Sequence, residues 1–196
     1  PTPIRERELE RICDALRREY REKRRKRQAD PRQVIWVEPV LRFVFYSGLR
    51  SAEVGQLKWK HIDLQRGLIR IEEQKNNRAQ TVPLVSKARE ALKQTPKPRE
   101  PEMYVFRTPN GSLRDRHEDS FGKRCSRRFA SARDRAGVDS DKTFHDLRAG
   151  FATALADAGM SAHQIKRAMR RSSLEMALKY VRVSNQTLKS EMEAAL

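Results

Sequence analysis

A histidine and an arginine stand three positions apart at His145 and Arg148, where the spacing of apolar residues predicts a helix. Residues three apart on a helix are neighbours, so both side chains can point into one cleft. An imidazole transfers protons near neutral pH, and a guanidinium binds anions through a fork of donors. The pair could therefore hold an anion and move a proton beside it. The alternative is an ordinary surface pair, because this spacing alone is a weak signal.

Tyr180 lies at the edge of an apolar helical stripe. It is one residue, or roughly 100° of helix, from Val181. A tyrosine at such a margin usually packs its ring and leaves its hydroxyl in water, and that is the alternative to a chemical role. The predicted stripe consists of Leu174, Ala177, Leu178 and Val181.

Two more cations occupy positions from which a long side chain can reach a ligand. Arg50 follows a Gly-Leu hinge and precedes a short predicted helix that begins with Ser51 as its cap. Lys75 lies at the tip of a predicted hairpin. Glu53, one helical turn after Arg50, is either a supporting partner of that arginine or an exposed acidic residue. The remaining histidines have no matched partner and are interpreted as surface or loop residues; they are His61, His117 and His163.

The elements that must position these residues are mainly helices. Asp146 is predicted to complete a capping box with Thr143, and a basic stretch at 17–27 either extends the first helix or forms a loop. Helices are predicted from a Thr2 cap with Pro3 at the first position, over about 34–46, 51–57, 86–94 and 121–136, and onward from Thr143, Ser161 and Ser172; strands are predicted at 68–71, 81–84 and 104–106. This pattern predicts an α+β fold, mainly α-helical with one small antiparallel β-sheet, in one compact domain.

The charge balance narrows the class of partner. The chain has 43 Lys and Arg against 26 Asp and Glu, a net charge of +17, which implies a polyanion such as nucleic acid. A merely solubilising or ribosomal surface is the alternative. No apolar run approaches the roughly 18 residues of a membrane span, and Cys13 and Cys125 are expected to be buried thiols. These features predict a cytoplasmic or nucleoid-associated protein.

Taken together, these residues resemble the catalytic domain of tyrosine recombinases, the phage integrase family, over nearly the whole chain. Order and spacing carry the resemblance: Lys75 stands eight residues before Pro83, and Tyr180 stands nine after Arg171. The matching segments are 47–59 (SGLRSAEVGQLKW), Lys75 with 81–84 (TVPL), 145–148 (HDLR) with 151–153 (FAT), and 171–174 (RSSL) with Tyr180.

The resemblance implies a fold, a reaction and a set of catalytic residues. The reaction would be site-specific DNA recombination or integration through a covalent 3′-phosphotyrosine, without metal, ATP or another cofactor. Arginines would clamp the phosphate, His145 would take the tyrosine proton, and Lys75 would protonate the departing 5′ oxygen. The implied catalytic residues are Arg50, Lys75, His145, Arg148, Arg171 and Tyr180.

One departure from the family pattern bears on activity. Residues 169–171 read Met-Arg-Arg where the family usually has Leu-Gly-His. Arg171 can still donate a hydrogen bond to a phosphate, but it cannot act as a base near neutral pH. Two alternatives therefore stay open: a DNA-binding protein of the same fold with reduced or lost catalysis, and an enzyme like a type IB topoisomerase.

The resemblance also carries expectations about organisation. Residues 1–196 are expected to form the catalytic domain of a bacterial or phage-encoded recombinase, without the N-terminal core-binding domain that family members carry. The expected partner is double-stranded DNA, with a homo-tetramer on DNA and a monomer or weak oligomer when free. The residues after 183 are expected to form a weak amphipathic helix that packs on a neighbouring protomer or on its own body.

Overall fold

The computed structural model describes residues 2–27, 30, 32–72, 79–109, 120–170, 174–181 and 192–193. They belong to two compact units, residues 1–151 and residues 152–196. The described part is mainly helical with one three-stranded antiparallel sheet, so the predicted fold class is confirmed.

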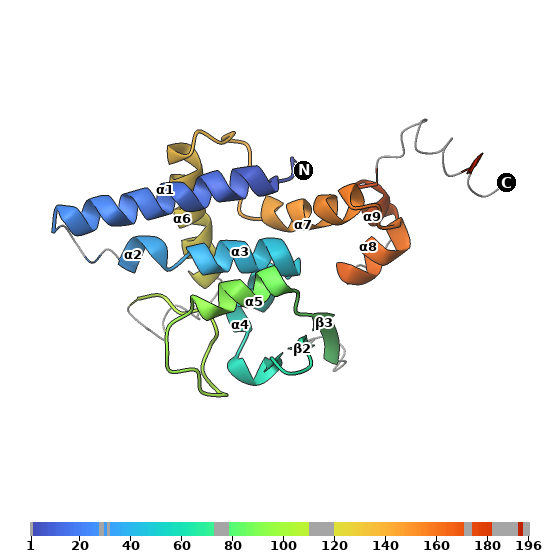
Figure 1. Ribbon diagram of the computed structural model, residues 1–196, viewed down its shortest axis with the longest axis horizontal. Coiled ribbons are helices and arrows are strands. Elements are labelled where there is room, and N and C mark those ends of the chain that lie inside the picture. The colour runs from blue at the N-terminus through green and yellow to red at the C-terminus, as the bar shows by residue number, and fades with distance from the viewer. Residues whose placement is uncertain are drawn as a thin grey trace. The chain divides into compact units, whose positions relative to one another are not determined.

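The larger unit contains most of the elements (Figure 1). Its helices are α1 (Glu6–Arg25), α2 (Arg32–Ile35), α3 (Glu38–Ser47), α4 (Ser51–Gln56), the 3₁₀ helix η1 (Trp59–His61), α5 (Ser86–Lys93) and α6 (Ser120–Arg135). Its strands are β1 (Ile62–Asp63), β2 (Leu68–Glu72) and β3 (Ala79–Pro83). Helix α7 (Asp146–Asp157) begins in this unit and continues into the smaller one, which also holds α8 (Ala162–Ala168) and α9 (Glu175–Leu178).

The first helix begins later than predicted. Thr2 and Pro3 precede it, and Arg5 is the N-cap, with its backbone N–H donating to a carboxylate oxygen of Glu8 at 2.8 Å. The predicted start was wrong because the backbone N–H of Ile4 has a partner elsewhere, the carbonyl of Asp146 at 3.2 Å. At its other end, α1 continues through the basic stretch to Arg25, so that stretch is helical.

The helix predicted over 34–46 is two helices. The chain turns at Trp36 and Val37 between α2 and α3, and Pro39 lies in the first turn of α3. The single-helix prediction was wrong because a proline ring clashes with the carbonyl four residues before it, so the helix restarts around Pro39. The predicted end at Gly48 is confirmed: Gly48 has a positive φ of 62°, and a Cβ there would overlap the ring of Phe151.

The sheet has the order β1-β2-β3, with Leu68 opposite Pro83. Pro83 is the last residue of an edge strand, where its missing N–H costs no ladder hydrogen bond, as predicted. The strand predicted at 104–106 is reduced to a single bridge between Lys58 and Tyr104. The tip of the predicted hairpin, which includes Lys75, lies outside the described residues.

The core of the larger unit lies between paired helices. In Figure 1, α3 runs beside α5, and α1 packs on α6. Aromatic rings join segments far apart in sequence, with the centroids of Phe43 and Phe106 5.0 Å apart. Cys13 and Cys125 are buried and free, as predicted, and burial raises the pKa of the Cys13 thiol to about 12.

Predictions for the helices α7, α8 and α9 are confirmed in part. Helix α8 begins after Ser161, as predicted, and Ser161 forms a capping box with Gln164. The predicted stripe around Tyr180 is wrong at Leu178, which is 52% exposed, because α9 ends after one turn there. Helix α7 begins at Asp146 and not directly after Thr143, whose N–H and hydroxyl both donate to the Asp146 carboxylate. Among the described residues, no helix combines the length and apolar character that a membrane crossing needs.

Candidate active site

Arg50 stands at the start of α4, on the short turn that follows α3. Its backbone N–H donates to the Glu53 carboxylate at 2.7 Å, and its guanidinium Nη1 donates to the other carboxylate oxygen at 2.9 Å. Glu53 therefore both caps the helix and orients the arginine, which explains why Arg50 and not Ser51 is the N-cap. The Arg50 side chain is 48% exposed, so it can contact a ligand from solvent while Glu53 holds one nitrogen of its guanidinium.

Arg148 reaches the same turn from α7. It is only 3% exposed, and its Nη1 donates to the backbone carbonyl of Gly48, two residues before Arg50. The close packing of Phe151 on Gly48 holds this part of α7 against the turn. Two arginines almost a hundred residues apart in sequence are thus brought to one turn of the larger unit.

His145 lies directly before α7 and is exposed. Its carbonyl accepts from the backbone N–H of Arg148 at 3.1 Å, in the first turn of the helix. The neighbouring Asp146 directs its carboxylate to Thr143, so it fixes the helix start that carries the histidine. His145 and Arg148 therefore share a helix start but differ in burial.

The other predicted catalytic residues are placed differently. Lys75 and Arg171 lie outside the described residues, as does His117. Tyr180 belongs to the smaller unit, where it is partly buried and its backbone N–H donates to the Ala177 carbonyl at 3.0 Å. The convergence of all six side chains around one phosphate stays a prediction.

A basic hollow beside the Arg50 turn was missed by the sequence interpretation. It measures about 320 Å³, and Glu53 forms part of its wall. The ammonium groups of Lys58 and Lys60 contact Glu102 at 3.0 and 3.1 Å, and their hydrogen bonds lower the pKa of that carboxyl. Arg70 also lines the hollow. The two lysines on either side of Trp59, Lys58 and Lys60, were the sequence feature that could have indicated this basic hollow.

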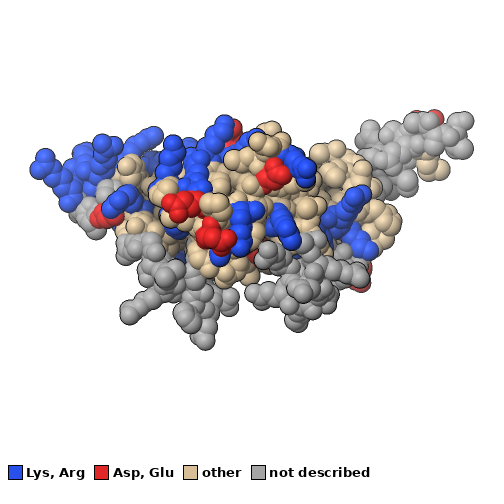
Figure 2. All heavy atoms as spheres, turned by 90° about the horizontal axis from the view of Figure 1, so that it is seen from below, with Lys and Arg blue, Asp and Glu red and all other residues tan. Residues whose placement is uncertain are grey.

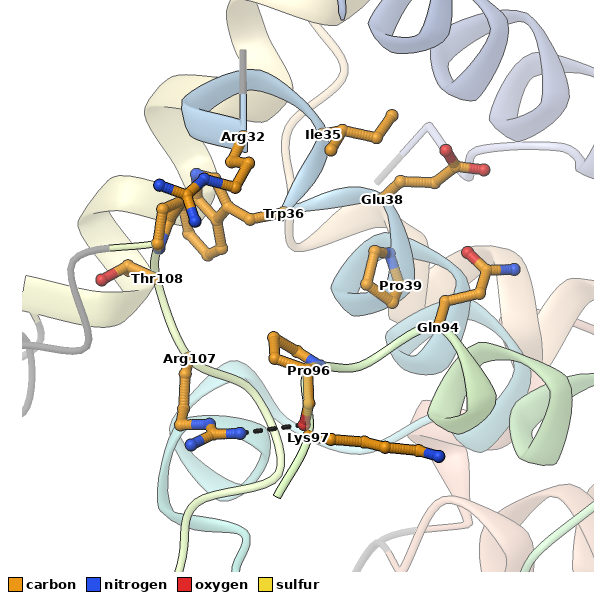
Figure 3. A pocket seen from close by; sticks show the side chains of 11 residues that line it. Arg32, Ile35, Trp36, Glu38, Pro39, Gln94, Pro96, Lys97, Arg107 and Thr108 are labelled. Atoms are coloured by element: carbon orange, nitrogen blue, oxygen red, sulfur yellow. Dashed lines mark hydrogen bonds between the residues drawn. The ribbon is translucent and has the colours of Figure 1, made fainter. Parts of the chain in front are cut away.

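A second cavity, of about 450 Å³, lies away from the arginine turn (Figure 3). Trp36 and Pro39 line one side, and Pro96 lines the other. Arg107 stiffens that second wall, because its Nη2 donates to the carbonyls of Pro96 at 2.8 Å and Pro98 at 3.0 Å. Of the described catalytic candidates in the larger unit, Arg50, His145 and Arg148 do not line this cavity.

On the face shown in Figure 2, basic side chains cover more of the surface than acidic ones and gather most densely at the left end. The end of α1 at the left carries Lys23 and a run of further cations to Lys26. Beneath it, the buried Glu19 contacts Lys23, Arg128 and Arg135, which joins α1 to α6. Burial, the largest single effect on the pKa of Glu19, raises it, but the three cations together outweigh burial and lower it.

The chain is similar to known integrases over most of its length. The model of the phage integrase family matches residues 3–187. The putative integrase/recombinase y4qK of Sinorhizobium fredii (strain NGR234) is 30% identical over 148 residues, which cover 74% of this chain and 46% of that protein. The integrase of Salmonella phage P22 is 28% identical over 158 residues, which cover 76% of this chain and 39% of that protein. The chain thus spans less than half the length of either relative.

Solved structures show the same fold at lower identity. XerH site-specific recombinase, in a post-cleavage complex with a palindromic difH substrate, has a TM-score of 0.68 and 21% identity, covering 98% of this chain and 52% of that chain. XerA recombinase has a TM-score of 0.65 and 19% identity, covering 100% and 64%. A lambda integrase dimer bound to a COC′ core site has a TM-score of 0.63 and 19% identity, covering 91% and 47%.

Proposed function

Because the chain belongs to the phage integrase family, we propose that it is a site-specific DNA recombinase that cuts and rejoins strands through a covalent 3′-phosphotyrosine. The observation that carries the proposal is the meeting of Arg50 and Arg148 at the turn after α3. The partner is double-stranded DNA, in keeping with the net charge of +17 and with the DNA complexes of XerH and lambda integrase.

The two arginines supply the charge that phosphoryl transfer requires. Attack on a phosphodiester builds negative charge on its non-bridging oxygens, and guanidinium donors fixed in advance stabilise that charge. The Gly48 carbonyl orients Arg148, and the Glu53 carboxylate orients Arg50. Each arginine is therefore held in position before substrate binds. The entropy cost of ordering these side chains in the transition state is then small.

The other residues complete a balanced exchange of esters. The Tyr180 oxygen bonds to phosphorus while the bond to the 5′ oxygen breaks; His145 takes the phenolic proton, and Lys75 gives a proton to the departing oxygen. Arg171 contacts the phosphate. In the rejoining step a 5′ hydroxyl attacks the phosphotyrosine and releases Tyr180. One ester replaces another at each step, so the exchange needs no ATP.

A trapping experiment tests this proposal without knowledge of the target site. Duplexes with a random core and a nick near it are incubated with the protein, and adducts that survive SDS are isolated and sequenced. A strand cut beside a nick loses its short 5′-hydroxyl fragment, so the phosphotyrosine accumulates. Wild type is expected to give adducts on a narrow set of sequences, Tyr180→Phe none, and the control Tyr20→Phe a wild-type yield.

The Met-Arg-Arg stretch at 169–171 favours one alternative, a DNA-binding protein of this fold with lost catalysis. Wild type that binds duplex DNA but never forms an adduct would support it. Relaxation of supercoiled plasmid without exchange between two duplexes would instead indicate chemistry like that of a type IB topoisomerase. We propose further that residues 1–196 form the catalytic domain and assemble as a tetramer on DNA, which light scattering with and without the selected duplex measures.

A further inference from the structure

The segment before α1 lies across the start of α7, the helix that carries Arg148. This N-terminal strap, residues 3–5, includes Ile4, which is fully buried and whose N–H donates to the Asp146 carbonyl at 3.2 Å. The ammonium group of Lys142 donates to the Pro3 carbonyl at 3.3 Å. The chain's N-terminal residues thus contact the backbone at the first residue of α7.

An ion pair fastens the strap to the residues that lead into α7. Lys142 is 7% exposed, and its Nζ lies 2.6 and 2.7 Å from the two carboxylate oxygens of Glu8. Glu8 also accepts from the N–H of Arg5, so one carboxylate joins the strap, the first turn of α1 and the approach to α7. Removing the Lys142 charge would leave the Glu8 carboxylate without its ion pair. The effect is expected to be large because Lys142 is buried and the pair is poorly screened by water.

A glycine lets the strap come this close. A Cβ at Gly150 would overlap the Ile4 carbonyl oxygen and lie 2.7 Å from a ring carbon of Phe45. The strap therefore contacts Lys142, Asp146 and Gly150, each four residues after the last. At the same helix start, Arg148 binds the Gly48 carbonyl.

Helix α7 is consequently held by two sets of contacts. The strap holds it through Asp146 and Gly150, and the turn after α3 holds it through Arg148 and Phe151. A shift of the strap would move the helix start on which His145 and Arg148 depend. We propose that Ile4, Glu8 and Lys142 are positioning residues that set the first turn of α7 for phosphate binding, an inference that rests on the proposed function.

The test compares two ion pairs that attach the first turn of α1 to its surroundings. Lys142→Met breaks the buried pair with Glu8, and Lys87→Met breaks the exposed pair of Lys87 with Glu6, which does not involve α7. Hydrogen exchange of the amides at 146–151 is expected to quicken in Lys142→Met and to stay at the wild-type rate in Lys87→Met. Lys142→Arg, which keeps a cation there, is expected to restore slow exchange.

The functional readout separates positioning from folding and from binding. At saturating selected duplex, Lys142→Met is expected to form the tyrosine adduct about tenfold more slowly, with DNA affinity within about twofold of wild type, because a misplaced phosphate contact slows chemistry. Gly150→Ala is expected to act in the same direction. Its matched control is Gly122→Ala in α6, where an added Cβ meets nothing within 4 Å.

Each outcome has a separate meaning. Equal exchange of the 146–151 amides in Lys142→Met and Lys87→Met overturns the strap proposal. The proposal is also overturned if adduct formation falls only in proportion to the unfolded fraction of the variant. A fall in adduct formation that matches a fall in DNA affinity overturns it as well, because the strap would then have a merely structural role. If wild type forms no adduct, the proposed function fails, and the exchange comparison still decides whether the strap holds α7.

Discussion

Arginines make different kinds of contact in two regions of the larger unit. Near the middle of α1, Arg17 and Arg42 converge on Glu38, whose side chain is only 4% exposed. Arg42 also makes two hydrogen bonds to Glu10, at 2.6 and 2.9 Å, and these raise its pKa. We call Glu10, Arg17, Glu38 and Arg42 the ionic cluster. Its two guanidiniums pair with carboxylates that belong to the fold.

At the turn after α3, the arginines are arranged otherwise. Arg148 is buried and donates to the neutral carbonyl of Gly48, and Arg50 is half exposed beside the carboxylate of Glu53. A guanidinium bound to a carbonyl keeps its charge for an anion, whereas one paired with two carboxylates does not. Under the proposed function, the arginines at this turn contact the scissile phosphate, whereas those of the ionic cluster hold the fold together.

The largest effect expected from this contrast is on Arg50. Arg50→Ala should slow adduct formation on the order of 10³-fold, about 4 kcal/mol, because a fixed donor to the developing charge is lost. The melting temperature should stay close to wild type. Quench-flow trapping at saturating duplex measures the rate, with Arg66→Ala, an exposed arginine on the turn between β1 and β2, as control. A loss in Arg66→Ala equal to that in Arg50→Ala would break the contrast.

Glu38→Ala should give the opposite result. Removal of the buried carboxylate leaves Arg17 and Arg42 without their shared partner and should lower the free energy of unfolding by about 3 kcal/mol. The adduct rate per folded molecule should be unchanged at a temperature where the variant is folded. Urea titration measures the stability, with the exposed Asp14→Ala as control. A variant that stays as stable as wild type would show that the cluster contributes little to the fold.

The pH dependence of stability should report the ionic cluster as well. The hydrogen bond from Arg42 lowers the pKa of Glu10 against the opposing effect of burial, so Glu10 stabilises the fold above its unfolded-state pKa. That contribution is lost as the pH falls through the lowered pKa of the folded state. Since Glu10 is partly exposed, the loss should be under about 1 kcal/mol. Urea titrations between pH 6 and roughly pH 3 should show a shallower decline for Glu10→Gln than for wild type.

The smallest effect is expected at an exposed pair. Lys26→Met removes the contact of Lys26 with Glu22, which is one turn earlier on α1. Solvent and salt screen such pairs, so the free energy of unfolding should stay within measurement error of wild type. Thermal unfolding at low and high salt measures it. A change as large as that of Glu38→Ala would mean that burial does not set the energetic scale of these contacts.

Signals carried by adjacent residues were read correctly from the sequence. Gly48 ends α3, Ser161 and Gln164 cap α8, and Pro83 ends an edge strand, since each depends only on backbone freedom or on side chains within one turn. The order of the motif segments indicated the family, which the match over residues 3–187 confirms.

Features that depend on distant partners could not be predicted. Thr2 and Pro3 favoured an earlier start of the first helix. The backbone N–H of Ile4 instead donates to the carbonyl of Asp146, which is far away in the sequence. Likewise, no local pattern shows that Arg148 is buried on the Gly48 carbonyl, while the similar Arg50 faces solvent. Sequence determined which residue types were available and in what order. Tertiary structure decided which of them are already paired, because hydrogen-bond partners of buried groups are chosen by packing across the chain.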